Sequence, residues 1–113
     1  LREFVEQCIK DAGECLVELR KQGNARAWSE VRETAHALKG ISENLGAQLV
    51  AERCQQLMRA SDEALAKELS RLQAELTAQM LVVAEQSRLA VSQLGKNGNN
   101  EAPGKAPGPD PAS

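Results

Sequence analysis

This chain of 113 residues has very few aromatic residues and only one histidine, and it has no proline before residue 103. It has no tyrosine, one tryptophan, one phenylalanine and one histidine, and all four prolines lie beyond residue 102. Residues 1–94 can therefore form long helices, because nothing in them breaks a helix as an internal proline does. Helix propensity and core filling account for almost every other position, so His36 is the residue that most needs a functional explanation.

Long apolar runs and blocks of basic charge are also missing. No apolar run approaches the roughly 20 residues of a membrane-spanning helix, and no leader with a small-residue cleavage site is recognisable. The 14 basic and 16 acidic side chains give a net charge of −2, without a basic block that would attract phosphate backbones or anionic lipid. These absences argue against nucleic acid and membrane as partners, and they predict a cytoplasmic location.

Cysteine is scarce, with only Cys8, Cys15 and Cys54. An odd number does not suit a secreted disulfide scaffold, and Cys8 and Cys15 would lie about 10 Å apart on one helix, too far to bridge. No pair of cysteines or histidines has the close spacing of zinc ligands. We therefore expect the cysteines to be small core residues, and we expect no metal or cofactor in this chain.

The patterning predicts an all-α fold, an antiparallel four-helix bundle with a long fourth helix. The chain has four amphipathic segments with short connections and no strand signal, and a bundle lets each helix bury its apolar face against another. The bundle is expected over residues 1–94, and a disordered tail over 95–113, which hold all four prolines and half of the eight glycines. A domain of this size buries roughly 60% of its unfolded surface, too little for a deep enzyme cleft.

The helices are predicted from apolar residues that recur at three- and four-residue steps. The first is expected over 2–22, the second over 25–44 after a stop and cap at Gly23-Asn24, the third after a left-handed turn at Gly46, and the fourth from a cap at Ser61. The residues expected to face inward are, helix by helix, Phe4, Val5, Cys8, Ile9, Ala12, Cys15, Leu16 and Leu19; Trp28, Val31, Ala35, Leu38 and Leu45; Leu49, Val50, Cys54, Leu57 and Met58; and Leu65, Leu69, Leu72, Leu76, Met80, Val83 and Ala90.

His36 is predicted to face water. At about 100° per residue, its side chain points roughly 140° away from the centre of the inward stripe of the second helix. Arg32 lies one turn before it, Lys39 and Gly40 lie one turn after it, and Glu43 lies two turns after it. These five residues should share one surface, which we call the His36 strip.

The His36 strip suits phosphoryl chemistry. A phosphoryl group on an imidazole nitrogen adds close to two negative charges, and the Lys39 ammonium can offset this by about 1 to 4 kcal/mol. Gly40 costs about 1 kcal/mol of helix stability relative to alanine, a cost that is explained if a partner or the phosphoryl group needs the space. An exposed imidazole is partly neutral at physiological pH and can therefore act as a nucleophile.

The segments Ala35-His36-Ala37-Leu38-Lys39-Gly40 and Asn44-Leu45-Gly46-Ala47 resemble the core motif of histidine-containing phosphotransfer (HPt) domains. The resemblance implies a four-helix bundle in which His36 accepts a phosphoryl group from an aspartate of a receiver domain and passes it to another receiver. It also implies that Lys39 is the charge partner, that Gly40 gives the receiver clearance, and that Leu45 and Gly46 set the turn into the third helix.

The same resemblance implies what other domains would supply. No ATP-binding motif is present, so the donor would be another protein domain, and Mg²⁺ would be held by the partner receiver. Such modules often end bacterial hybrid sensor kinases, and the chain is similar to those of quorum-sensing kinases. It would then be the cytoplasmic part of an inner-membrane sensor kinase, without autonomous kinase activity.

Two positions depart from the family pattern. Ile41 stands where a small or hydroxylated residue is usual, and Met58 stands where many members carry a Glu or Gln that faces the histidine ring. Gln55, one turn before Met58, is the candidate to orient the imidazole instead, and Arg32 is a second supporting residue.

The alternative from another class is a non-catalytic helical adaptor, which binds receivers or itself without phosphotransfer. A repeat in the fourth helix favours a coiled-coil seam, but it persists for under three clean turns, so we expect a monomer rather than a homodimer. If the chain has no transfer chemistry, a close helix crossing would explain Gly40. A third possibility is a phosphotransfer fold that only binds a receiver.

Overall fold

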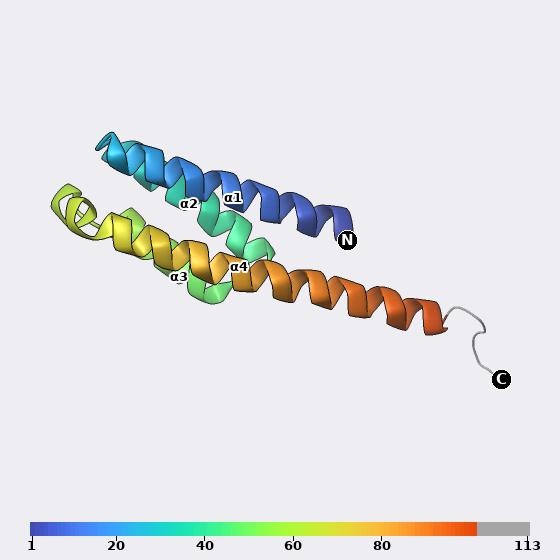
Figure 1. Ribbon diagram of the computed structural model, residues 1–113. Coiled ribbons are helices and arrows are strands. Elements are labelled where there is room, and N and C mark those ends of the chain that lie inside the picture. The colour runs from blue at the N-terminus through green and yellow to red at the C-terminus, as the bar shows by residue number, and fades with distance from the viewer. Residues whose placement is uncertain (102–113) are drawn as a thin grey trace.

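The computed structural model describes the backbone of residues 1–101 and the side chains of residues 1–95. It confirms the all-α prediction, since the described residues contain four helices and no strand: α1 (Arg2–Asn24), α2 (Trp28–Asn44), α3 (Gln48–Arg59) and α4 (Asp62–Glu101). Each helix packs on two others, α2 on α1 and α3, and α4 on the same two, so α2 and α4 lie diagonally opposite. The result is a four-helix bundle (Figure 1).

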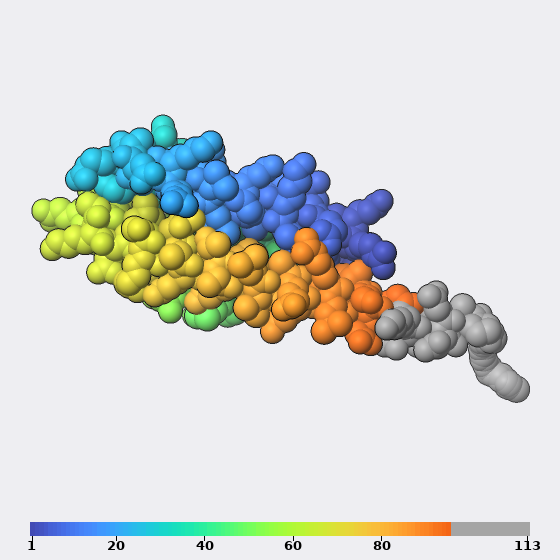
Figure 2. Space-filling view, in the orientation of Figure 1, coloured from blue at the N-terminus to red at the C-terminus, as the bar shows by residue number. Residues whose placement is uncertain are grey.

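The bundle is not of even length. The helices α1 and α4 have 23 and 40 residues, whereas α2 and α3 have 17 and 12. The N-terminal part of α1 and the C-terminal half of α4 therefore extend beyond the α2–α3 hairpin (Figure 1). In the space-filling view, α1 and α4 form most of the visible face, and α2 is largely hidden behind α1 (Figure 2).

Most residues that were predicted to face inward form the core. Fully buried side chains come from all four helices and pack together in one cluster. Cys15, Trp28, Leu45, Met58, Leu72 and Val83 are half-buried against it. The predicted residues that are buried in the cluster are Ala12, Leu16, Leu19, Val31, Ala35, Leu38, Val50, Cys54, Leu57, Leu65, Leu69, Leu76 and Met80.

Three inward assignments were wrong. Phe4 is 52% exposed and Ala90 is exposed, because both lie where α1 and α4 extend beyond the hairpin and each helix has only one neighbour. Leu49 is 53% exposed. The turn before α3 sets the phase of that helix so that Val50 and Ala51 point inward, which leaves Leu49 about 100° outside the stripe.

The connection between α1 and α2 also differs from the prediction. Helix α1 continues through Asn24, and α2 begins at Trp28 rather than at Ala25, without a side-chain cap. Arg26 takes the left-handed conformation, with φ of 56°. The Ala27 N–H donates to the Gln22 carbonyl at 2.9 Å, and the Arg26 N–H donates to the Gly23 carbonyl at 3.0 Å. This is a Schellman motif, which ends the helix through its backbone.

The other two connections follow the prediction. Gly46 has φ of +71°, and the Ala47 N–H donates to the Ser42 carbonyl at 2.8 Å, so a second Schellman motif ends α2. The Ala64 N–H donates to the Ser61 hydroxyl oxygen at 3.1 Å, which caps α4.

Helix α4 runs past the predicted boundary at Leu94 and continues to Glu101. Glycine and asparagine lower helix stability by up to about 1 kcal/mol each, but they do not block a helix sterically. The first residue that does so is Pro103, which also disfavours the helical conformation of the residue before it. The rest of the predicted tail, 102–113, lies outside the described residues.

Candidate functional site

His36 lies on the outer surface of α2, as its helical phase predicts. Its side chain is exposed, whereas Ala35 and Leu38 on the opposite side of the helix are fully buried. The imidazole therefore has access to solvent, and the two buried residues hold the helix beneath it in the core.

Lys39 is less free than the sequence suggests. Its side chain is only 29% exposed, and its Nζ donates to Glu43 Oε2 at 3.0 Å. Burial raises the pKa of the Cys54 thiol on α3 to about 12, Cys15 adds to this rise, and the Lys39 charge opposes it. The ammonium of Lys39 therefore has a carboxylate partner one turn beyond it, and its charge reaches the buried thiol of Cys54.

Arg32 is held by the connection between α3 and α4. Its Nε and Nη2 donate to the Ala60 carbonyl oxygen at 3.2 and 3.0 Å, and Nη2 also donates to the Asp62 carboxylate. The side chain is 29% exposed. The guanidinium thus ties α2 to the start of α4, and no hydrogen bond joins it to His36 among the described side chains.

Gly40 has open space beside it. A Cβ atom built there would meet nothing within 4 Å, so the chain itself makes no close helix crossing at this residue. A tight contact lies instead at Gly23, where a Cβ would come within 2.5 Å of the Leu69 side chain on α4. Local periodicity does not reveal this contact, because Leu69 lies far from Gly23 in the sequence.

The two departures from the family pattern have a packing explanation. Ile41 and Met58 are half-buried against the hydrophobic core, so both fill space between the helices. Gln55 is half-buried on α3, but no hydrogen bond joins it to His36 in the part of the chain with described side chains. Ser42, which the sequence did not single out, is fully buried and donates to the Leu38 carbonyl at 2.7 Å.

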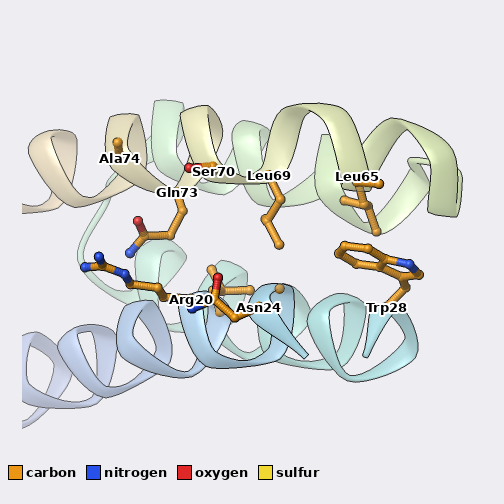
Figure 3. Close-up of a pocket in the computed structure, with 11 residues that line it drawn as sticks. Arg20, Asn24, Trp28, Leu65, Leu69, Ser70, Gln73 and Ala74 are labelled. Carbon is orange, nitrogen blue, oxygen red and sulfur yellow. The ribbon is translucent and has the colours of Figure 1, made fainter. Parts of the chain in front are cut away.

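A pocket near the bundle core lies elsewhere. It has a volume of about 450 Å³ and lies between α1 and α4, where Trp28 and Leu65 face each other and Arg20 and Gln73 line the opposite end (Figure 3). His36 is not among its lining residues. His36 thus lies on the exposed surface of α2 and apart from this pocket.

Two further properties bear on the site. Among the described residues, no three His, Cys, Asp or Glu side chains are grouped so that they could hold a metal ion. No described helix is both long enough and apolar enough to cross a membrane.

Comparison with known proteins agrees with this geometry. The family model for the Hpt domain matches residues 3–86. The sensory/regulatory protein RpfC from two strains of Xanthomonas campestris pv. campestris is 41% identical over 81 residues, which cover 68% of this chain and 11% of the relative. No solved structure matches the chain.

The chain thus spans about a tenth of the length of these curated relatives. The family match covers most of α1 to α4, including His36 and the turn at Gly46. Together with the helical bundle and the outward-facing histidine, it shows that this chain belongs to the Hpt domain family.

Proposed function

We propose that this chain is a phosphorelay intermediate, in which His36 accepts a phosphoryl group from a receiver-domain aspartate and passes it to a second receiver. The observation that carries the proposal is the exposed imidazole on α2, with Lys39 and the open surface at Gly40 one turn away, in a member of the Hpt family. The module would act within a larger sensory protein, as the likeness to RpfC suggests.

The transfer is a displacement at phosphorus. The neutral Nε2 atom of His36 attacks the acyl phosphate in line, the N–P bond forms as the P–O bond breaks, and the aspartate leaves as a carboxylate with the electron pair of that bond. The return reaction hands the group to a second aspartate. Positioning and charge neutralisation dominate such a step, and the receiver would supply Mg²⁺.

The docking surface should be small and the complex short-lived. Ala37 is exposed and Ile41 is half-buried beside it, which gives a modest apolar patch next to the imidazole. Small, transient signalling contacts are typically at the low end of interface size. A receiver can therefore approach Gly40 closely, deliver its phosphoryl group and leave.

The test is transfer from a phosphorylated receiver. The chain is mixed with labelled phospho-receivers, and acid-labile, alkali-stable label on the chain is measured. Label that is absent in His36→Gln, with the helical circular dichroism of the variant unchanged, supports the relay. A chain that stays unlabelled with several active receivers contradicts it.

The second candidate is the helical adaptor. It is favoured by the exposed apolar side chains of Leu81, Val82 and Leu89 on α4, which are 69, 52 and 60% exposed. Large exposed apolar side chains on one helix are typical of an interaction surface. Sedimentation equilibrium tests self-association through α4, which the relay does not need. An adaptor that binds receivers instead would form a complex with them and take no label in the transfer assay.

A further inference from the structure

Both cationic side chains of the His36 strip already have carboxylate partners. Arg32 is bound to Ala60 and to Asp62, and Lys39 Nζ lies 3.0 Å from Glu43 Oε2. The Lys39 and Glu43 side chains are 29 and 54% exposed. A phosphoryl group on His36 would therefore meet no unpaired cation on its own helix face among the side chains described, and it would have to compete for Lys39.

The competition has a direction along the helix. Glu43 lies about 6 Å beyond Lys39 along the helix axis, whereas His36 lies about 4.5 Å before it. The two anions would thus pull the ammonium toward opposite ends of α2. When the Lys39 ammonium moves toward Glu43, it moves away from the phosphoryl group and stabilises its negative charge less.

We propose that Glu43 is a positioning residue that shortens the lifetime of phosphorylated His36 by holding Lys39 away from it. This inference rests on the proposed phosphotransfer function. Exposed pairs of lysine and glutamate one turn apart on a helix are weak, so the effect should be about twofold. A weak tether suits a carrier, because the phosphorylated form must form and then also release its phosphoryl group to the next receiver.

The experiment compares Glu43→Gln with the wild-type chain in two assays. The chain is phosphorylated chemically with phosphoramidate, and the half-life of phosphohistidine is followed at low ionic strength; discharge to a receiver is then timed. Glu43→Gln should lengthen the half-life and slow discharge by about twofold. Glu43→Asp, which keeps the charge but shortens the reach to Lys39, should behave like Glu43→Gln.

The controls separate pairing from other effects. Glu68→Gln removes a carboxylate with an arginine partner, Arg71, on α4, which lies diagonally opposite α2, and it should change neither rate. The effect of Glu43→Gln should disappear in a Lys39→Ala background and in about 1 M salt, where charges are screened beyond about 3 Å.

The proposal is overturned if Glu43→Gln leaves the half-life of phosphohistidine unchanged. It is also overturned if the half-life changes equally with and without Lys39, or if Glu43→Asp behaves like the wild-type chain, because both results indicate direct repulsion by the carboxylate. Failure of the phosphorelay function has a different signature, because His36 would then take label from phosphoramidate but from no receiver.

Discussion

Replacing Arg32 with methionine should destabilise the bundle by about 1.5 to 3 kcal/mol. The substitution keeps much of the apolar stem but removes the hydrogen bonds to the Ala60 carbonyl oxygen, at 3.0 and 3.2 Å, and the contact with the Asp62 carboxylate. Hydrogen bonds that involve a charged group contribute about that much, and the loss leaves a part-buried carbonyl oxygen without its partner. The side chain is 29% exposed, so water compensates only partly.

Urea unfolding followed by circular dichroism measures this loss, with Arg88→Met as the matched control. Arg88 also makes two hydrogen bonds, at 2.8 and 2.9 Å, to the Glu6 carboxylate, and it lowers the pKa of Glu6, but both side chains are about half exposed. Exposed pairs contribute little, so the control should lose clearly less stability. Arg32→Lys, which keeps the charge but not the planar fork, should fall between Arg32→Met and the wild-type chain.

Equal losses in Arg32→Met and Arg88→Met would refute the reasoning, because they would mean that burial and the Ala60 carbonyl add nothing. The same variants also test the predicted supporting role of Arg32. A structural role lowers stability and leaves the rate of transfer to His36 unchanged at temperatures where the variant is folded. A fall in that rate for folded Arg32→Met would indicate that the Arg32 guanidinium takes part in phosphoryl transfer.

The other predictions concern glycines and thiols. Gly40→Ala should raise stability by up to about 1 kcal/mol, because its Cβ meets nothing, while slowing transfer from a receiver. Gly23→Ala should be less stable than Gly40→Ala, because the buried Leu69 side chain would have to move away from the new Cβ. Urea unfolding of both variants and a transfer assay on Gly40→Ala check these expectations. Gly46→Ala should cost about 1 to 2 kcal/mol, since φ of +71° is strained for an L residue with a side chain, and a stability unchanged within error would show that the turn relaxes. The buried Cys54 has a pKa raised from 9.0 to about 12, so the folded chain holds this proton more tightly than the unfolded chain. The contribution of this thiol to stability should be constant from neutral pH to about pH 9 and fall as the pH rises toward 12, so unfolding measured at each pH should show a smaller alkaline loss in Cys54→Ala.

Helical phase predicted the side of the helix on which His36 lies, but it did not predict the partners of its neighbours. The phase of α2 follows from Val31, Ala35 and Leu38, which are all fully buried, so the outward direction of His36 was determined locally. The partners of Arg32 lie 28 and 30 residues away in the chain, and no local pattern contains them. For the same reason the close approach of Gly23 to α4 was not predicted.

The lengths of neighbouring helices set a second limit. Phe4 belongs to the apolar stripe of α1, yet it is 52% exposed, because the α2–α3 hairpin ends before reaching it. Periodicity describes one helix at a time and does not say how far its neighbours extend. The left-handed Arg26 was missed for a related reason, since a Schellman motif is predicted from glycine and here the backbone takes that conformation without one.

In the proposed relay, the contacts made by α2 would give the His36 acceptor a defined position. Arg32 ties the first half of α2 to the start of α4, and the Schellman motif at Gly46 fixes its end against α3. Between these points Ala35 and Leu38 are fully buried, so the backbone beneath His36 cannot shift without disturbing the core. The exposed His36 side chain thus projects from a helix that is packed firmly beneath it, and a reacting group on a rigid element needs little reorganisation when a partner docks. In the proposed relay, this packing would let a small module present its nucleophile in a defined position, while the receiver would contribute the rest of the reaction centre.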